Sequence, residues 1–317
     1  GEMAAITTEL LGCGRSLADA LGEELSAVLL GTHPDGTAQE AISYGADKVY
    51  VVDDQLLDDY QADSYLAAME AVVKTAPPKI LLIGQTAIGR DLTPRLAFRL
   101  ESAATMDCVA LDLDPDSQRL LSTKPVYGGN AQAVFTSESD PQIASIRAKA
   151  MSPLEPDPSK EGQVVSVDAG LDPSVVRTRL LERVVEEVEG VKLEDAPVIA
   201  TGGRGLDGPE SFEQLRVLAD LLKGAVGATR PVCDNGWMPE TYQVGLTGKI
   251  VTPDVYIAVA VSGATQHMAG CSGARTIVAI NRDPHANIFR EAHYGVVGDW
   301  KTVLPAFTEK IRELVSD

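Results

Sequence analysis

The residues best suited to bind a ligand follow an apolar run near the C-terminus. The run Tyr256–Val261 ends at the small residues Ser262-Gly263-Ala264, and Gln266 and His267 come shortly after. Small residues let a ligand approach the backbone closely, and amide and imidazole side chains supply directed hydrogen bonds. A lone histidine is more often structural than functional. Its place at a strand end favours a binding role for His267, because ligands of open parallel sheets bind at the carboxyl ends of strands.

Three other polar segments also follow apolar runs in this part of the chain. The run 197–200 leads into the turn Gly202-Gly203-Arg204-Gly205, Asn281 follows the run 276–280, and Asp299 follows 295–298. A strand, a Gly-rich turn and a helix together aim backbone N–H groups at a phosphate. The turn lacks a full GxGxxG or Walker A pattern, so a plain tight turn stays open as an alternative. The repetition at strand ends indicates one shared binding edge.

Two further loops have two interpretations each. The segment Gly227-Ala228-Thr229-Arg230 is either a helix end with a solvated arginine or a site that puts Arg230 over an electron-rich ring. In Gln243–Lys249, two glycines flank Thr247 and let the backbone come close to a ligand. An ordinary turn with Lys249 in solvent is the other interpretation. In either case we expect a strand over 250–251 after the loop. Spacing alone does not separate these alternatives.

The elements that position these residues follow an alternating pattern of strands and helices. Short apolar runs separated by helical periodicity predict an α/β fold with two domains, each a mainly parallel sheet with helices on both faces. The expected strands are 27–31, 48–52, 79–83, 109–113, 120–125, 131–136, 143–147, 164–167, 197–200, 255–261 and 276–280. The expected helices are 7–25, 38–44, 62–74, 92–100, 209–223 and 303–315. Segment 176–185 is ambiguous, and the acidic stretch 186–195 is the expected linker between domains 1–190 and 191–317.

The charge of the chain excludes several classes of function. Lys and Arg number 27 against 46 Asp and Glu, a net charge of -19, which repels nucleic acid and anionic membrane surfaces. No apolar run is long enough to span a membrane, so we expect no direct membrane insertion. The four scattered cysteines form no CxxC, which argues against a metal site or disulfide framework and favours the cytoplasm.

The charge is also uneven along the chain. Residues 1–200 hold 16 basic and 33 acidic residues, a net of -17, whereas residues 201–317 hold 11 and 13, a net of -2. A well-solvated N-terminal surface explains this imbalance as readily as a C-terminal part that tolerates an anionic ligand.

Taken together, these segments resemble the electron transfer flavoprotein α subunits. Residues 255–281, VYIAVAVSGATQHMAGCSGARTIVAIN, are similar to the signature of that family. The resemblance extends, at matching spacings, through VIATGGRGL, GAVGATRP, YQVGLTGKIV, AINRDP and YGVVGDW. It covers 197–317 strongly and 1–150 more loosely, through ELLGCGRSLADALGEELSAVLLG and PVYGGNAQA. The family's usual first strand has no counterpart before Gly1, so either the numbering begins late or that edge of the sheet is absent.

The resemblance implies an electron carrier rather than a self-sufficient enzyme. It implies a Rossmann-like C-terminal domain that binds FAD, and an N-terminal domain that packs on a β subunit to form a heterodimer. The implied role is to pass electrons between dehydrogenases, such as acyl-CoA dehydrogenases, and a redox acceptor. Electron bifurcation in the family depends on a second flavin in the β subunit.

The resemblance also implies roles for individual residues. Arg204 would contact the diphosphate–adenosine side of FAD, Arg230 would lie against the isoalloxazine ring, and Thr247 would bond near flavin N5. His267 would sit near flavin O2, and Asn281 and Asp299 would hold the adenosine end. The expected cofactor-binding residues are Arg204, Thr229, Arg230, Gln243, Val244, Gly245, Leu246, Thr247, Ser262, Gly263, Ala264, Thr265, Gln266, His267, Asn281, Asp299 and Trp300.

Two residues depart from the family pattern, and two other functions stay open. Thr229 stands where Ser is common and keeps the hydroxyl, whereas Leu246 stands where Gln is common and removes one side-chain contact. A nicotinamide-dependent oxidoreductase is the first alternative, although no acidic ribose-binding residue follows a full GxGxxG. A subunit that has lost its cofactor site is the second, and the presence of Arg230, Thr247 and His267 argues against it.

Overall fold

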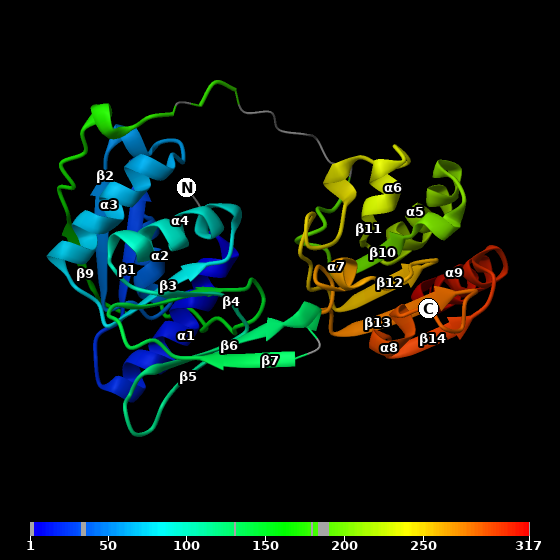
Figure 1. The fold of residues 1–317 in the computed structure, drawn as a ribbon, viewed down its shortest axis with the longest axis horizontal. Helices are drawn as coiled ribbons and strands as arrows, with labels where there is room; N and C mark the ends of the chain where they lie inside the picture. The colour runs from blue at the N-terminus through cyan, green and yellow to red at the C-terminus, as the bar shows by residue number, and fades with distance from the viewer. Residues whose placement is uncertain (1–2, 33–35, 130, 179, 183–189, 317) are drawn as a thin grey trace. The chain divides into compact units, whose positions relative to one another are not determined.

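The computed structural model describes residues 3–32, 36–129, 131–178, 180–182 and 190–316. The chain divides into two compact units, residues 1–126 with 132–184 and residues 127–131 with 185–317 (Figure 1). The predicted boundary at residue 190 adjoins residues outside the described ranges and stays a prediction. No helix in the described part of the chain is long and apolar enough to cross a membrane.

The N-terminal unit alternates strands and helices and then adds a series of short strands. Its helices are α1 (Ala5–Leu21), α2 (Thr37–Ser43), α3 (Ala62–Thr75) and α4 (Ala87–Arg99). Its strands are β1 (Ser26–Gly31), β2 (Lys48–Asp53), β3 (Ile80–Gly84), β4 (Ala104–Cys108), β5 (Ala110–Leu113), β6 (Leu120–Val126), β7 (Ala131–Phe135), β8 (Gln142–Ile146) and β9 (Gln163–Ser166). The strand expected over 109–113 is confirmed as β5, whereas β4, which directly precedes it, was not predicted. The part of 176–185 that is described, residues 176–178 and 180–182, is neither helix nor strand.

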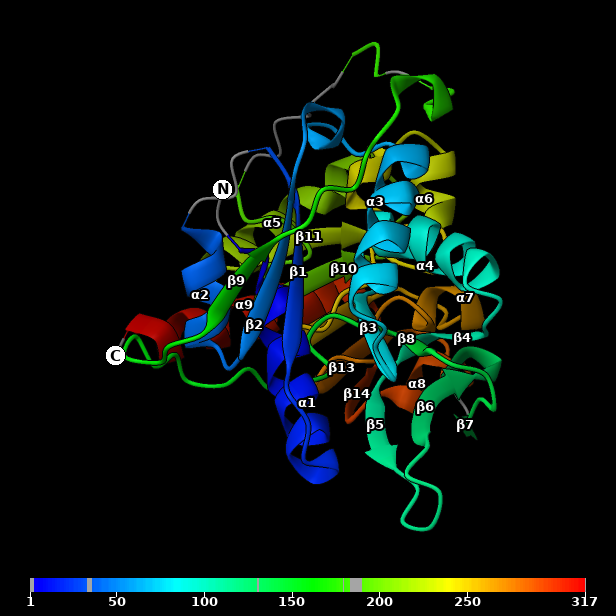
Figure 2. The same ribbon diagram turned by 90° about the vertical axis from the view of Figure 1, so that its left-hand side faces the viewer.

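The strands of this unit form three sheets rather than one. Strands β1, β2 and β9 form one parallel sheet and lie side by side in Figure 2. Strands β3, β8 and β4 form a second parallel sheet, and β5, β6 and β7 form a third in which β5 and β6 are antiparallel. Helices cover both faces of the first sheet. Ala27 and Leu29 of β1 pack with α1 and α2, while Val28 and Leu30 pack with α3.

A cavity separates the two parallel sheets of this unit. Its volume is about 740 Å³, and consecutive residues of both β1 and β3 line it, together with apolar side chains of α1 and α3. Each of the two strands pairs on one side only, with β2 and with β8 respectively. The cavity therefore runs along two strand edges that do not pair with each other.

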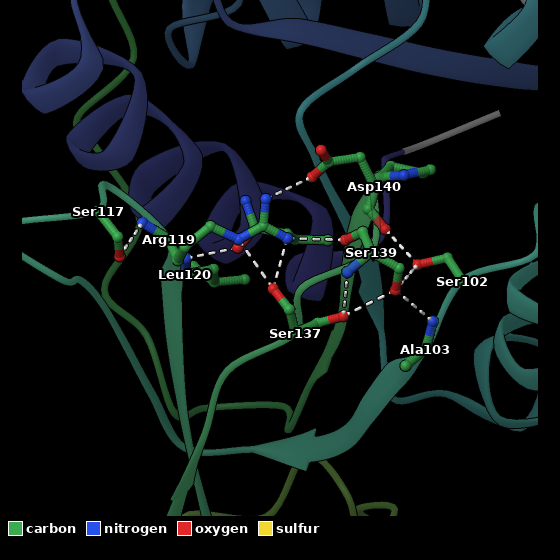
Figure 3. A network of polar contacts seen from close by, with 10 residues as sticks. Ser102, Ala103, Ser117, Arg119, Leu120, Ser137, Ser139 and Asp140 are labelled. Atoms are coloured by element: carbon green, nitrogen blue, oxygen red, sulfur yellow. Dashed lines mark hydrogen bonds and ion pairs between the residues drawn. The ribbon is translucent and has the colours of Figure 1, made fainter.

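Arg119 holds the segment between β7 and β8 in place (Figure 3). Arg119 donates to the carbonyls of Ser137 and Ser139 and pairs with the Asp140 carboxylate at 2.9 Å. The Ser102 hydroxyl donates to the Pro141 carbonyl at 2.6 Å. Because the guanidinium satisfies several backbone carbonyls at once, it takes the place of regular sheet pairing across this loop.

The C-terminal unit is a single parallel sheet with its helices. The strands are β10 (Val198–Gly202), β11 (Ala225–Ala228), β12 (Val255–Val259), β13 (Thr276–Asn281) and β14 (Tyr294–Val297). The helices are α5 (Phe212–Leu221), α6 (Arg230–Asp234), α7 (Thr265–Met268), α8 (Ile288–Glu291) and α9 (Trp300–Ser316). The strand order is β11-β10-β12-β13-β14 with every pairing parallel, so the predicted α/β class is confirmed.

The two faces of this sheet are buried by different helices. Ile257 and Val259 of β12 pack on one face with α5 and α9, whereas Tyr256 and Ala258 pack on the other with α7 and α8. Alternate residues of β12 are thus buried in the cores on the two faces of the sheet, which explains why its sequence is a continuous apolar run.

One expected strand of this unit is wrong. Residues 250–251 lie in irregular structure, and only an isolated bridge joins Val244 to Lys249. Strand β11 (Ala225–Ala228) was not predicted, because its two alanines and one glycine have low strand propensity. Its burial in the sheet overrides that weak local preference.

The backbone conformation directly after β12 leads us to predict a stabilising substitution at Ala260. Ala260 has φ +55°, in the left-handed region that costs a residue with a Cβ about 1–2 kcal/mol. We expect Ala260→Gly to raise the free energy of unfolding by about 0.5–1 kcal/mol, measured by urea denaturation. Ala258→Gly, two residues earlier in the regular strand, is the matched control and should lower it by about 1 kcal/mol. Equal destabilisation by both variants would contradict strain at Ala260.

Candidate functional site

The strand order of the C-terminal unit creates a topological switch point between β10 and β12. The chain leaves β10 toward β11 on one side, and the later strands β12, β13 and β14 are added on the other (Figure 1). Ligands of such sheets bind outside the carboxyl ends of the strands at this point. Because all five strands are parallel, the segments that follow them emerge at the same edge.

The Gly-rich turn after β10 lies directly against the end of β12. The Gly203 N–H donates to the Val259 carbonyl at 2.9 Å. A Cβ at Gly203 would lie 2.1 Å from the Ala260 carbonyl oxygen, so no other residue fits there without a shift. The next residue, Arg204, is exposed, and no carboxylate or carbonyl in the described part of the chain bonds its guanidinium. The turn therefore presents a free cation at the switch point.

A second arginine follows β11. The Thr229 N–H donates to the Gly202 carbonyl at 3.1 Å, which ties this segment to the Gly-rich turn. Arg230 begins the short helix α6, is exposed, and contacts Asp234 at 3.6 Å one helical turn away. Arg230 thus starts a helix after a strand, rather than ending a helix, and its loose ion pair leaves it available to another anion.

The loop 243–249 is held close to both β11 and α7. The Val244 N–H donates to the Ala228 carbonyl at 2.9 Å, and the Leu246 N–H donates to the Gln266 carbonyl at 2.7 Å. The Gln243 side-chain amide donates to the Thr247 hydroxyl at 3.0 Å. Among the described residues no acceptor bonds the Thr247 O–H, and the Thr247 and Leu246 side chains are exposed, so this O–H can donate outward.

Lys249 remains partly exposed, as the turn interpretation expected, but it also has a partner. Its ammonium pairs with the Glu194 carboxylate. The pair anchors the end of the 243–249 loop to the segment that precedes β10.

The segment after β12 exposes its polar side chains and buries its glycine. Gly263 has φ +77°, and a Cβ there would lie 2.2 Å from the Ile288 nitrogen. The Ser262 carbonyl accepts the Ile288 N–H at 3.1 Å. The exposed side chains of this segment are Ser262, Ala264, Thr265 and Gln266. The backbone is therefore fixed by α8 while these side chains remain open to a ligand.

His267 differs from its neighbours because it is buried. Its Nδ1 lies 3.0 Å from the Val244 carbonyl and its Nε2 lies 3.0 Å from the Tyr256 hydroxyl. Burial lowers the pKa of His267 from 6.5 to about 4, and the bond to Val244 opposes this shift. His267 is therefore neutral at pH 7, and both of its ring nitrogens are engaged within the chain.

The residues expected at the adenosine end lie around a small pocket. Its volume is about 90 Å³, and it is lined by residues that follow β10, β12, β13 and β14, among them Ala260, Asn281, Asp299 and Trp300. The Asn281 amide donates to the Val261 carbonyl at 2.8 Å, and the Trp300 indole donates to the Gly205 carbonyl at 3.1 Å. These two hydrogen bonds hold together the segments at this edge of the sheet.

The Asp299 side chain also has a role within the fold. Its carboxylate accepts the Lys301 N–H at 3.0 Å in the first turn of α9. Asp299 remains exposed, so part of its carboxylate still faces the pocket.

Two family models match separate parts of the chain. Residues 1–172 match the family described as the electron transfer flavoprotein domain, and residues 192–272 match the electron transfer flavoprotein FAD-binding domain. An electron transfer flavoprotein subunit alpha from Thermoanaerobacterium thermosaccharolyticum is 43% identical over 99% of this chain and 95% of that protein. The chain belongs to the electron transfer flavoprotein α subunit family.

Other relatives carry two different names. The electron transfer flavoprotein subunit alpha of Megasphaera elsdenii is 42% identical over 99% of this chain and 94% of that protein. The protein FixB of Clostridium saccharobutylicum is 39% identical over 100% of this chain and 94% of that protein. Membership of the electron transfer flavoprotein family therefore rests on similarity along nearly the whole chain, not on the C-terminal signature alone.

The residues at the switch point fit the FAD that the matched domain implies. Two backbone segments approach so closely at Gly203 and Gly263 that a Cβ would collide. Arg204, whose guanidinium has no partner among the described residues, directly follows Gly203, and the side chains of Ser262 and Thr247 are exposed. Cations and hydroxyl donors are the groups that bind an anionic diphosphate and a polar ring. The pocket of about 90 Å³ is much smaller than FAD, so only one end of the cofactor would enter it.

Sequence reasoning missed two residues that matter to this edge. Tyr256 was assigned only to an apolar run, yet its hydroxyl is the buried partner of His267. A tyrosine in an otherwise aliphatic strand was the available signal, because a buried phenol requires a polar partner. Ala260 was also missed, since no sequence pattern indicates that its φ is positive.

Alanine substitutions at two glycines with similar φ angles can distinguish the cost of backbone strain from the cost of a steric clash. Gly263 (φ +77°) and Gly236 (φ +71°) both disfavour a Cβ, but at Gly236 no atom lies within 4 Å of its position. We expect Gly236→Ala to lower the free energy of unfolding by about 1 kcal/mol. Gly263→Ala should lower it by about 2 kcal/mol more, because the added Cβ meets the α8 backbone. Urea denaturation measures both, and equal losses would show that the contact with Ile288 is unimportant.

Proposed function

We propose that this chain is the FAD-binding α subunit of an electron transfer flavoprotein. In this proposal it pairs with a β subunit and carries electrons between dehydrogenases, such as acyl-CoA dehydrogenases, and a redox acceptor. The matched FAD-binding domain over 192–272 supports the cofactor, and the relatives named as α subunits support the partner. The observation that carries the proposal is the convergence of Arg204, Arg230 and Thr247 around the strand ends of one switch-point sheet.

FAD supplies reversible one- and two-electron chemistry when bound. The part of this chain is to bind and orient the cofactor and to set the charge around it. Arg204 would bind the diphosphate, because no group in the described part of the chain bonds its guanidinium, which can fork onto phosphate oxygens. The Thr247 hydroxyl would donate a hydrogen bond to a ring nitrogen, since Gln243 already occupies its acceptor side.

Arg230 would stabilise negative charge on the ring system. A guanidinium keeps its charge at any relevant pH, so its field favours the more negative form of a nearby group. Leu246 offers only apolar contact, so no side-chain hydrogen bond to the cofactor is expected from that position. The exposed residues Ser262 and Gln266 would bind the polar chain between the ring and the diphosphate.

The visible spectrum of the protein tests the proposal. The purified chain, co-expressed with its β subunit, should show flavin bands near about 375 and about 450 nm, or gain them when FAD is added. A protein that stays colourless after incubation with FAD refutes the proposal. A nicotinamide-dependent oxidoreductase would instead bind NADH and show no flavin bands.

The flavin content of the heterodimer decides between two classes of complex. One FAD for each pair of subunits is expected of a simple carrier. Two flavins for each pair would place the complex in the electron-bifurcating class.

Replacing Arg230 predicts a shift in redox potential. Arg230→Ala should lower the potential of the first one-electron reduction of bound flavin by about 60 mV, which equals about 1.4 kcal/mol. The shift is downward because the lost cation no longer stabilises the added negative charge. Redox titration with spectral detection measures it.

Arg216→Ala is the matched control for this variant. Arg216 is also exposed on a helix and also lies 3.6 Å from an acidic neighbour, Glu213, but it stands in the middle of α5 rather than directly after a strand. Its replacement should leave the potential unchanged. An unchanged potential in Arg230→Ala would contradict the placement of Arg230 beside the flavin.

A further inference from the structure

His267 is the centre of a buried polar cluster on one face of the C-terminal sheet. Tyr256 on β12 is fully buried, and His267 on α7 is 7% exposed. The tyrosine hydroxyl and the histidine Nε2 are 3.0 Å apart, and the histidine Nδ1 and the Val244 carbonyl are also 3.0 Å apart. The imidazole therefore joins three separate segments, which are β12, α7 and the loop 243–249.

The chemistry of the partners fixes the protons in this cluster. A backbone carbonyl only accepts hydrogen bonds, so Nδ1 must carry the proton that it shares with Val244. Burial keeps His267 neutral at pH 7, so Nε2 carries a lone pair and accepts the Tyr256 O–H. Tyr256 can make this donation throughout the physiological range, because burial raises its own pKa well above 10.

We propose that Tyr256 is a positioning residue that holds His267 as the neutral Nδ1–H tautomer, with which His267 clamps the loop 243–249 to α7. The clamp acts beside a second contact, the Leu246 N–H to the Gln266 carbonyl at 2.7 Å. Together they fix the loop that carries Thr247. The consequence for flavin binding rests on the proposed function, whereas the clamp itself does not.

The clamp also sets a condition on any ligand near His267. Both ring nitrogens are used within the chain, so the imidazole has no N–H to offer a ligand while Val244 and Tyr256 keep their bonds. A donation from His267 to a flavin oxygen requires one of these bonds to break.

The first test is nitrogen-15 NMR of the histidines in the flavin-free full chain. His267→Gln identifies the His267 resonances among those of the four histidines. The expected result is one protonated nitrogen, Nδ1, and no titration of the ring between pH 5 and pH 9. A ring protonated at Nε2, or one that titrates near pH 6.5, would overturn the proposal.

The second test compares Tyr256→Phe with Thr308→Val. Loss of the phenol leaves Nε2 without a donor, so its resonance should move toward that of a free unprotonated nitrogen. Exchange of the hydrogen-bonded amides of Gly245 and Leu246 should become about 10-fold faster by hydrogen exchange and NMR. Thr308→Val is the matched control, because it also removes a buried hydroxyl from the C-terminal unit, one that donates to the Leu304 carbonyl at 2.8 Å on the opposite face of the sheet.

The outcomes of the second test separate the clamp from a general packing role. The control variant should leave the histidine resonances and the exchange of the loop unchanged. Unchanged resonances and exchange in Tyr256→Phe would refute a positioning role for the tyrosine. These measurements need no flavin, so a chain that fails to bind FAD would refute the proposed function and leave the clamp intact.

Discussion

The binding edge of the C-terminal unit depends on the close approach of two backbone segments at the switch point. Gly203 donates its N–H to Val259 and lies so near the Ala260 carbonyl that a single Cβ would collide with it. This approach brings the ends of β10 and β12 together, and the turn that follows β10 then exposes Arg204 at the same edge. Ala260 adopts the left-handed backbone conformation, which allows the chain to turn after β12. Strain of this kind persists only where the surrounding structure over-determines it, and it clusters at binding sites.

Electrostatics agree with the geometry of this edge. The N-terminal two hundred residues carry almost the whole net negative charge, and the C-terminal part is close to neutral. Arg204 has no partner among the described residues and Arg230 has only a loose one, so two cations are available where strands end. A strongly acidic surface around them would cancel their field. The uneven charge is thus consistent with an anionic cofactor on one unit and a solvated surface on the other.

The parts of the site that sequence reasoning could predict all follow from one physical rule. Polar residues after apolar runs must meet at one edge when the strands are parallel, and this places Arg204, Ser262 and Asn281 together without knowledge of any contact. The strand β11 was not predictable in this way, since Ala225–Ala228 is too short and too weak in propensity. The separation of the N-terminal strands into three sheets depends on pairings between distant residues. Strand β8, for example, joins β3 from about sixty residues later, and no local pattern records such a pairing.

The buried and exposed polar groups of the C-terminal unit have different tasks. Tyr256 and His267 use all of their hydrogen-bonding groups inside the chain, and they can do so because burial keeps both of them neutral. Thr247 lies on the loop that they hold, and its hydroxyl accepts from Gln243 while its proton remains free. A flexible loop would have to lose conformational entropy before it could donate that proton to a ligand. Because the buried cluster has already ordered the loop, the donor is in place before the ligand arrives.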